Sequence, residues 1–508
     1  MIETRKNDLL SSGPFSICLL LQTPPSRMRP RALFSLSGPH PRWTCLYATA
    51  VARRPLVTLA IETSCDDTAV AVLERRHPSQ TTRLLFNERV SADLRAYRGV
   101  RPAAALESHQ RTLAGLVQQA ISRLPDDGHG RRRPDFVAAT RGPGIHSNLA
   151  TGLFTAKGLA LAWGVPLVGV HHMQAHALTP RLVHALGMPM AGEDPASASM
   201  SASGVSTPEF PFLTFLVSGG HAQLVLSAGL TDHRVLATTT DAAIGNVLDQ
   251  TARVILPASV LAACPDVMYG RHLEAYAFPD PPPSDDSSSS SSDNNPYAFY
   301  TPPRSRADEL ADVDTGYTWR VPPPMRTTRR LAYSFSAIHS TVHAVAASRG
   351  DAMDDAERRA LARHTQRAAF DHLASRLCLA LDPAADYDGA ALARASTTLV
   401  VAGGVACNKF LMHVLRTTLA ARGLLSDSSN GGSGGIREII APPPALCTDN
   451  AAMIAWAGME MYEAGWCSDL DVAPLPKWPL DPGVRLPEKS SGGGSGGLME
   501  VGGWLRRE

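Results

Sequence analysis

Two segments that lie far apart in the sequence repeat one pattern, in which a polar tip separates two apolar arms. The first runs from Leu56 to Leu73 and carries acids, hydroxyls and one thiol at its tip; the second runs from Phe212 to Leu226 and carries Ser218, Gly219 and Gly220 there. Each pattern predicts a strand, a turn and a second strand. Two similar hairpins in one chain predict a duplicated α/β lobe. A nucleotide phosphate chain could bind between two such lobes and contact both of them.

The apolar runs after the first hairpin fit the same architecture. The strand Asp135–Thr140 leads into the turn Gly142–Gly144 and then into a helix rich in Ala, Gly and Leu, which returns to a strand at Val165–Val170. This strand–helix–strand order is typical of α/β folds. A glycine-rich turn at a helix N-terminus also favours anion binding.

A second glycine turn follows the apolar run Thr398–Ala402. Gly403 and Gly404 come directly after this strand, and Asn408 follows them. A glycine pair permits the backbone to approach a flat ligand closely, and an asparagine amide can hydrogen-bond a ribose or a base. A helix predicted over 241–253 carries a further polar candidate, Asp249.

The stretch that points most directly to chemistry is His171–His176, which follows the strand Val165–Val170 and opens a predicted helix. Residues four apart on a helix share a face, so His172 and His176 can present two imidazoles to one metal ion. Far downstream, Asp449 lies at a predicted loop-to-helix junction. Two imidazoles and one carboxylate form a three-ligand site that leaves positions open for substrate. The alternative is a structural histidine pair and an aspartate that caps a helix.

Composition narrows the class of protein. The chain of 508 residues carries 48 Lys and Arg against 47 Asp and Glu, a formal charge of +1, so any contact with nucleic acid must come from a local patch. Its 8 cysteines form no Cys-x-x-Cys pair, which argues against a zinc ribbon or a disulfide framework. No apolar run approaches the roughly 18–20 residues that span a membrane. We therefore expect a globular protein of a reducing or matrix-like compartment that has no membrane segment.

The N-terminal end and several internal stretches differ in composition from the predicted core. Residues 1–54 accumulate arginines, and no acid occurs between Asp8 and Glu62, which is typical of a mitochondrial targeting segment; the alternative is a disordered extension without targeting value. Serine-rich and glycine-rich stretches predict loops. The predicted organisation is a targeting segment at 1–54, a first α/β lobe at 55–187 completed by a helix at about 451–465, a flexible insertion at 188–208, a second α/β lobe at 209–450 with disordered insertions at about 279–306 and 426–435, and a tail at 485–508.

Six short motifs are together specific where each alone is weak, and they occur in one order: Ile61–Thr68, Gly142–Gly144, His171–His176, Leu216–His221, Ala402–Asn408 and Cys447–Asn450. This order resembles the tRNA N6-adenosine threonylcarbamoyltransferase family, formerly called O-sialoglycoprotein endopeptidases. The resemblance covers about residues 56–465, interrupted by the insertions. The double-histidine and Cys-Thr-Asp-Asn motifs are similar to the bacterial and mitochondrial branch of the family.

The resemblance implies an actin/hexokinase/Hsp70-like fold, in which two α/β lobes enclose a ligand cleft. It also implies a reaction: the threonylcarbamoyl group moves from threonylcarbamoyl-adenylate to N6 of the adenosine at tRNA position 37, and AMP is released. The implied partners are a tRNA, a separate synthetase that supplies the adenylate, and a second copy of the chain in a homodimer. The implied location is the mitochondrial matrix.

The matching motifs also imply roles for individual residues. His172, His176 and Asp449 would hold one divalent metal ion, iron or zinc, which would act as a Lewis acid on the adenylate phosphate or the carbamoyl oxygen. Asp66 would be a catalytic residue that orients the metal or the attacking amine. The residues expected to bind the adenylate are Leu216, Val217, Ser218, Gly219 and Gly220 on its phosphate side and Asp249, Gly270, Gly403, Gly404 and Asn408 at its ribose and base.

The sequence departs from the family pattern at four places, none of which removes an expected metal ligand. Asn246 replaces an acid, which lowers the negative charge on its helix. The segment Cys264–Arg271 replaces Tyr-Pro-Gly-Gly, with Gly270 as its nearest match. Ala451 replaces a glycine, and His146–Asn148 replaces a run of small apolar residues.

Three other functions would use some of the same features. A phosphotransferase of the two-lobed superfamily would use the paired hairpins and a metal, but sugar and acetate kinases do not need the histidine pair. A metallopeptidase would need His-Glu-x-x-His, whereas Gln174 supplies no general base. A non-catalytic scaffold paralogue would be expected to lose metal ligands, and all three are present. For the tRNA footprint, the candidates are Arg326, Arg329 and Arg330, with a solvated loop as the alternative.

Overall fold

The computed structural model describes residues 54–76, 81–97, 99–126, 130, 132–191, 206–279, 295–426, 435–484 and 497–507. The predicted targeting segment up to residue 53 and most of the insertions predicted at 188–208, 279–306 and 426–435 lie outside the described residues. Among the helices in these ranges, none is both long and apolar enough to cross a membrane.

The first sheet has seven strands in the order β12-β11-β5-β4-β1-β2-β3. β1 pairs antiparallel with β2, and β2 with β3, whereas β1, β4 and β5 run parallel. β1 and β4 are buried along nearly their whole length, as expected for strands that helices cover on both faces. The strands are β1 (Leu56–Glu62), β2 (Asp67–Arg76), β3 (Thr81–Ser91), β4 (Phe136–Gly142), β5 (Leu167–His171), β11 (Trp466–Ser468) and β12 (Trp504–Arg506).

The second sheet has five strands in the order β10-β9-β6-β7-β8. β6 pairs antiparallel with β7, and β7 with β8, whereas β6, β9 and β10 run parallel. The order and the directions are those of the β5-β4-β1-β2-β3 part of the first sheet. This repetition confirms the predicted duplicated α/β fold of the actin/hexokinase/Hsp70 type. The strands are β6 (Phe212–Val217), β7 (Ala222–Ser227), β8 (His233–Thr238), β9 (Thr398–Ala402) and β10 (Glu438–Ile440).

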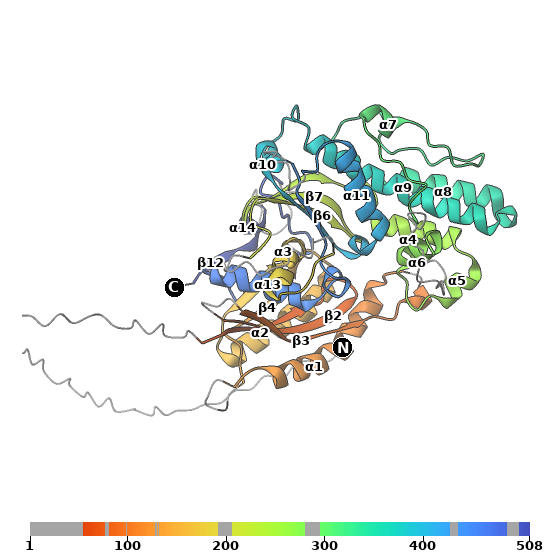
Figure 1. The fold of residues 1–508 in the computed structure, drawn as a ribbon. Coiled ribbons are helices and arrows are strands. Elements are labelled where there is room, and N and C mark those ends of the chain that lie inside the picture. Colours follow the sequence, from red (N-terminus) through yellow and green to blue (C-terminus); the bar gives the residue numbers. More distant parts are fainter. Residues whose placement is uncertain are drawn as a thin grey trace, which may run out of the picture. The chain divides into compact units, whose positions relative to one another are not determined.

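The helices follow the strands in the same sequence in both copies, and the second copy has extra helices between its third and fourth strands (Figure 1). In the first copy they are η1 (Arg95–Tyr97), α1 (Pro102–Arg123), α2 (His146–Trp163) and α3 (His172–Ala185). Those that follow β6–β8 are α4 (Ile244–Ile255), α5 (Ala258–Ala263), α6 (Tyr269–Ala277), α7 (Arg306–Leu310), α8 (Ser336–Arg349), η3 (Gly350–Ala352), α9 (Asp355–Ala380) and α10 (Ala390–Ala395). The remaining helices are η4 (Gly404–Cys407), α11 (Lys409–Ala421), α12 (Pro444–Cys447), α13 (Ala451–Glu463) and α14 (Leu498–Gly502).

Helices α3 and α13 follow the fifth strand of their respective copies, and they join the two sheets. α13 packs on β1, β2, β4 and β5, while α3 packs on α13 and also contacts β6 and β9. The close approach of α13 needs a residue without a side chain at Gly458, because a Cβ there would lie 2.9 Å from the Cβ of Ala138. Trp456 on α13 is fully buried. One hydrophobic cluster therefore contains residues of both sheets, and it fixes the N-termini of α3 and α13 close together.

Two stretches that the sequence predicts as disordered loop and tail contain residues that are packed into the fold. Within the predicted loop 279–306, Tyr300 is 7% exposed; its hydroxyl donates to Asp371 at 2.7 Å and its ring contacts Phe410. The prediction of disorder does not hold for this part, because aromatic residues after the serine run supply the apolar surface that the serines lack. In the predicted tail, residues 497–507 form α14 and β12, and β12 lies at the edge of the first sheet.

Candidate metal centre

The start of α3 is fixed by the histidine that precedes it. His171 is the N-cap residue, and its Nδ1 accepts hydrogen bonds from the backbone N–H groups of Met173 and Gln174 at 3.2 and 3.4 Å. Its Nε2 lies 3.0 Å from the carbonyl oxygen of Trp478, to which it donates. Burial lowers the pKa of His171 to about 3, so the ring is neutral and one of its nitrogens can serve as a capping acceptor.

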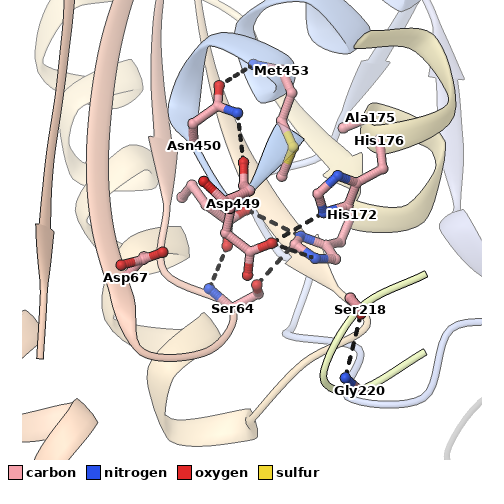
Figure 2. A network of polar contacts seen from close by, with 12 residues as sticks. Ser64, Asp67, His172, Ala175, His176, Ser218, Gly220, Asp449, Asn450 and Met453 are labelled. Carbon is pink, nitrogen blue, oxygen red and sulfur yellow. Dashed lines mark hydrogen bonds and ion pairs between the residues drawn. The ribbon is translucent and has the colours of Figure 1, made fainter. Parts of the chain in front are cut away.

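One turn of α3 brings two of the predicted ligands together. His172 and His176 lie on one face of the helix, and their rings meet edge to face at 4.7 Å. The carboxylate oxygen Oδ1 of Asp449 lies 3.5 Å from Nε2 of His172 and 3.0 Å from Nε2 of His176. One ligand atom from each residue lies within 4.8 Å of the others (Figure 2). In the part of the chain that the structure describes, this is the only such group of histidine, cysteine, aspartate or glutamate side chains.

Asp449 is free to face the histidines because its neighbour caps the following helix. The N-cap residue of α13 is Asn450, whose side-chain oxygen accepts from the N–H of Met453 at 3.0 Å (Figure 2). The amide of Asn450 also donates to the carbonyl oxygen of Thr448 at 2.8 Å. The alternative in which Asp449 itself is a helix cap is therefore excluded by geometry.

The charges of the three residues suit a cation. Burial alone would raise the pKa of Asp449, but His172 and His176 hold it well below its usual range. Burial would lower the pKa of His172, but the negative charges of Asp449 and Glu62 raise it to about 9. Two imidazole nitrogens and one carboxylate oxygen are ligands that both iron and zinc accept. The residues present therefore fit a divalent ion, which would take the place of the proton on His172.

Glu62 is a site residue that the sequence did not single out. It ends β1, is fully buried, and its Oε2 lies 3.4 Å from Nδ1 of His172. Its other oxygen accepts from the N–H of Ser64 at 2.6 Å, and Oε2 also accepts from the hydroxyl of Thr140. Burial raises the pKa of Glu62, but His172 and the hydrogen bonds lower it below its ordinary value. A carboxylate behind a ligating histidine fixes the ring and its tautomer.

His221 is a second residue that the prediction left out, although it directly follows the Ser-Gly-Gly tip. Burial, together with the nearby His172 and His176, lowers its pKa to about 4. The ring is therefore neutral, and it lies on the β6–β7 side of the metal centre. The signal in the sequence was the histidine itself at the end of a glycine turn.

The predicted phosphate-side residues divide into two kinds. The side chains of Leu216 and Val217 are buried in the core, so only their backbone could face a ligand. Ser218 is half-buried, and its hydroxyl accepts from the N–H of Gly220 at 3.3 Å (Figure 2). Gly219 and Gly220 are exposed at the turn.

The glycine turns of the second sheet pack against this tip. Gly403 has a φ of +96°, and a Cβ there would lie 2.5 Å from the carbonyl oxygen of Val217. A Cβ on Gly245, at the start of α4, would lie 2.7 Å from the backbone of Ser218. Gly404 is exposed beside Thr448. Three turns thus meet within van der Waals contact next to the metal centre.

The predicted ribose and base residues are less uniform. Asp249 accepts from the N–H of Gly270 at 2.6 Å, and burial raises its pKa to about 6. Asn408, in contrast, is 7% exposed; its amide donates to Gln366 at 2.9 Å and its oxygen accepts from the N–H of Leu411 at 3.0 Å. The side chain of Asn408 therefore caps α11 and is already hydrogen-bonded within the protein.

Another carboxylate, Glu274 on α6, lies beside Asn408 and was not predicted. Its Oε1 accepts from the N–H groups of Lys409 and Phe410 at 2.7 and 3.4 Å. Burial raises its pKa despite these bonds. Its spacing, one helical turn after Gly270, is the signal that could have identified it.

The predicted catalytic residue Asp66 lies at the tip of the first hairpin. Its carbonyl oxygen accepts from the N–H of Ala92 at 3.0 Å, which ties the tip to the end of β3. Burial raises the pKa of Asp66, and the charge of Asp449 adds to this effect. The next residue, Asp67, has a pKa raised to about 7 by burial. Two carboxyl groups that hold protons more tightly than usual therefore border the metal centre.

Comparisons with known proteins show which family this chain belongs to. The family model described as tRNA N6-adenosine threonylcarbamoyltransferase matches residues 84–203 and 181–456. The chain is 32% identical to "tRNA N6-adenosine threonylcarbamoyltransferase, mitochondrial" of Schizosaccharomyces pombe, covering 85% of this chain and 89% of that protein. It is 32% identical to the tRNA N6-adenosine threonylcarbamoyltransferase of Novosphingobium aromaticivorans, covering 83% and 95%. Among solved structures, HypF of T. kodakarensis aligns with a TM-score of 0.39 and 12% identity over 82% of this chain and 49% of that one. The chain belongs to the tRNA N6-adenosine threonylcarbamoyltransferase family.

Proposed function

We propose that this protein transfers the threonylcarbamoyl group from threonylcarbamoyl-adenylate to N6 of the adenosine at tRNA position 37 in mitochondria. Family membership supports the reaction. The observation that carries the proposal is the group of His172, His176 and Asp449, whose ligand atoms lie within 4.8 Å of one another. A scaffold paralogue has no need of this arrangement, and a sugar-kinase-like phosphotransferase has no need of the histidine pair.

The reaction forms a bond between N6 of the adenosine and the carbamoyl carbon and breaks the bond from that carbon to the phosphate oxygen. A divalent ion held by His172, His176 and Asp449 would supply Lewis acidity to the departing phosphate or the carbamoyl oxygen. Glu62 would hold the ring of His172 in place through Nδ1. Asp66 would orient the attacking amine, which loses one proton as the new bond forms.

The remaining residues would hold the adenylate. The exposed N–H groups of Gly219 and Gly220 are donors at a turn, which is a common way to bind phosphate oxygens. Asp249, ionised above its pKa of about 6, would accept hydrogen bonds from the ribose hydroxyls. Gly270, Gly403 and Gly404 would let the ribose and the base approach the backbone closely. Asn408 would contribute through the turn that it caps, because its amide is already engaged.

The deciding experiment measures transfer of labelled threonylcarbamoyl from its adenylate to an unmodified tRNA transcript. We expect activity in the intact protein and its loss in His172→Ala and Asp449→Ala. His184→Ala is the matched control, because His184 lies on the same helix in its last turn and is not a ligand. Full activity in the first two variants would refute the metal assignment. No transfer by the intact protein, even with a synthetase supplied, would favour the scaffold or the phosphotransferase.

The metal is proposed to be one iron or zinc ion per subunit. The donor set accepts either ion. Elemental analysis of protein purified without added metal, with and without anaerobic handling, distinguishes them. The stoichiometry should fall to near zero in Asp449→Ala, whereas a ratio unchanged by this substitution would place the ion elsewhere.

The proposed assembly is a homodimer that receives its adenylate from a separate synthetase. Support for the dimer comes from α2, where Phe154 and Leu161 are 58% and 71% exposed. They are seven residues apart and therefore share one face of the helix. Leu161→Glu should shift the mass measured by light scattering from dimer to monomer. Leu392→Glu, at an exposed leucine on α10, is the control, and a monomeric wild type would refute the proposal.

The proposed location is the mitochondrial matrix. Support comes from the arginine-rich, acid-poor composition of residues 1–54 and from the mitochondrial relative of Schizosaccharomyces pombe. A fusion of residues 1–54 to a fluorescent protein should enter mitochondria. Replacement of Arg27, Arg29 and Arg31 by glutamate should abolish import, and cytosolic fluorescence of the unaltered fusion would refute the location.

A further inference from the structure

Arginine–tyrosine pairs occur on both sides of the junction between the two lobes. The guanidinium of Arg101, at the start of α1, lies over the ring of Tyr97 with its Cζ 4.6 Å from the ring centroid. The guanidinium of Arg253, on α4, lies over Tyr269 at 5.3 Å. The two pairs are neighbours, because Nη2 of Arg253 lies 3.6 Å from the point that a Cβ on Gly99 would occupy.

One neighbouring residue on each lobe connects these pairs to the reaction centre. On the first lobe, Arg89 donates to the hydroxyl of Thr448 and, at 3.2 Å, to the carbonyl oxygen of Asp449. The chain then continues from β3 to η1, which contains Tyr97. On the second lobe, Arg253 follows Asp249 by one helical turn. We call Arg89, Tyr97, Arg101, Arg253 and Tyr269 the rim.

Two of the three arginines of the rim carry positive charge without a close ion pair. Within the described residues, neither Arg101 nor Arg253 has a carboxylate oxygen within 4.0 Å, and Nε of Arg253 is buried without a hydrogen-bond partner, whereas Arg89 pairs with Asp67 at 3.5 Å. The candidates from the sequence are different. Arg326 is paired with Asp312 at 3.1 Å, and Arg329 with Asp382 at 2.7 Å. These ion pairs partly neutralise the two arginines and therefore weaken their attraction for another anion.

The combination of an exposed aromatic ring with unpaired guanidinium groups matches one class of ligand. Single-stranded RNA is bound by stacking of its unpaired bases on aromatic rings and by arginines on its phosphates. Tyr97 is 47% exposed, so one face of its ring remains available beside Arg101. An enzyme that modifies a base takes it out of the stack, which leaves the neighbouring nucleotides in need of another support.

We propose that the rim binds the anticodon loop of the tRNA on both sides of the acceptor adenosine. A base adjacent to that adenosine stacks on Tyr97, and Arg101 and Arg253 contact the flanking phosphates. This inference rests on the proposed function for the identity of the RNA. Tyr97 and Arg101 are not among the residues proposed to bind the adenylate.

The test measures equilibrium binding of an unmodified tRNA transcript to the full-length protein, with AMP binding by calorimetry as a separate readout. Tyr97→Ala should weaken tRNA binding by about 5- to 150-fold, the range for loss of one stacked base, while Tyr97→Phe keeps the ring and should bind as the wild type does. Arg101→Ala should weaken binding and reduce the slope of log affinity against log salt by about 0.7–1. AMP binding should not change.

Helix α1 supplies a matched control. Arg123 is the last residue of the helix that Arg101 precedes, and 22 residues at 1.5 Å each place it about 33 Å away. Arg123→Ala should bind tRNA as the wild type does. Equal binding by wild type, Tyr97→Ala and Arg101→Ala would overturn the rim, as would weakening by Arg326→Ala in their place. Failure of the wild type to transfer threonylcarbamoyl would instead refute the proposed function, and the binding data would still decide the rim.

Discussion

The carboxylate behind His172 gives the sharpest test of the metal centre. In Glu62→Gln, one side-chain oxygen must still accept from the N–H of Ser64, which lies 2.6 Å from Oε1. The new amide nitrogen then takes the place of Oε2, 3.4 Å from Nδ1 of His172. Because an amide N–H donates, it favours the tautomer in which Nδ1 accepts and Nε2 carries the ring proton, and the hydroxyl of Thr140 loses its acceptor there. Nε2 faces Asp449, so in this tautomer its lone pair is lost to the metal.

The size of the effect follows from the remaining acceptors. The hydroxyl of Ser64 lies 3.3 Å from Nδ1 of His172 and can still accept its proton. We therefore expect Glu62→Gln to weaken metal binding by about tenfold, the lower end of the range for residues behind a metal ligand, and the double variant with Ser64→Ala by about a hundredfold. These factors correspond to about 1.4 and 2.7 kcal/mol.

The pH dependence of this loss has a definite sign. Asp449 and Glu62 raise the pKa of His172 to about 9 in the metal-free protein, so protons compete with the metal in the wild type at every pH below that value. Without Glu62 the pKa of His172 falls, and the variant suffers less proton competition. The ratio of wild-type to variant affinity should therefore increase as the pH rises from about 6 to 9.

The assay is competition for Zn²⁺ against a fluorescent chelator across this pH range, with thermal unfolding as a check of folding. Glu460→Gln is the matched control, because Glu460 is a buried carboxylate that pairs with Arg181 at 2.8 Å and lies away from the ligands. It should leave Zn²⁺ affinity unchanged. An affinity of Glu62→Gln within twofold of wild type at pH 8–9, or a ratio that falls with pH, would refute the role of Glu62.

Three further predictions use the same fold. Asp449→Ala should lower the pKa of His172 below about 9, which NMR titration of the metal-free protein measures. Removal of the metal by a chelator should lower the melting temperature of the wild type but not that of the variant. A chelator effect that persists in the variant would contradict this prediction. Gly403→Ala should destabilise the protein by about 1–3 kcal/mol in urea unfolding, because its φ is +96° and the added Cβ would lie 2.5 Å from the carbonyl oxygen of Val217; unchanged stability would show that the turn can move. The pKa of Asp249 is raised to about 6 against about 3.9 in the unfolded chain, so the free energy of unfolding of the wild type falls as the pH rises from 4 to 6. Asp249→Asn should be more stable than wild type by about 2 kcal/mol at pH 7, after allowance for partial exposure, and equally stable below pH 4. The same difference in stability at both pH values would refute the raised pKa.

The sequence predicted the repeated hairpins because their signal is local. Alternating apolar arms around a polar tip define β1–β2 and β6–β7 without knowledge of any partner strand. The pairing of the short strand β12 was out of reach, because Trp504–Arg506 joins the sheet only through β11, which lies almost 40 residues earlier at Trp466–Ser468. Strand order depends on such non-local contacts. Burial of Tyr300 was missed for the same reason, since its partner Phe410 lies far along the chain.

The site shows the same division between local and non-local signals. The spacing of His172 and His176 is a helical property and was readable from the sequence. Glu62 was not selected, although a charged residue at the end of a buried strand is rarely buried without a partner; its partner is 110 residues away. The sequence around Asn408 was consistent with two roles, a hydrogen bond to a ribose or base and the capping of the helix that follows. The structure agrees with the second role, which is common for an asparagine before a helix.

The position of the metal centre follows from the duplication itself. His172 opens α3 and Asp449 directly precedes the N-cap of α13, and these are the equivalent helices of the two copies. Two helix N-termini therefore point towards one place, and their partial positive charges oppose a cation there. The carboxylates of Glu62 and Asp449 offset this, since together they balance the two positive charges of a divalent ion. The metal and these two carboxylates then present no net negative charge to the incoming adenylate phosphate, and the two helix N-termini favour it. Replacement of Glu62 by a neutral group would thus weaken metal binding without weakening the attraction of the helix N-termini for phosphate, so that phosphate affinity should fall less than metal affinity in Glu62→Gln.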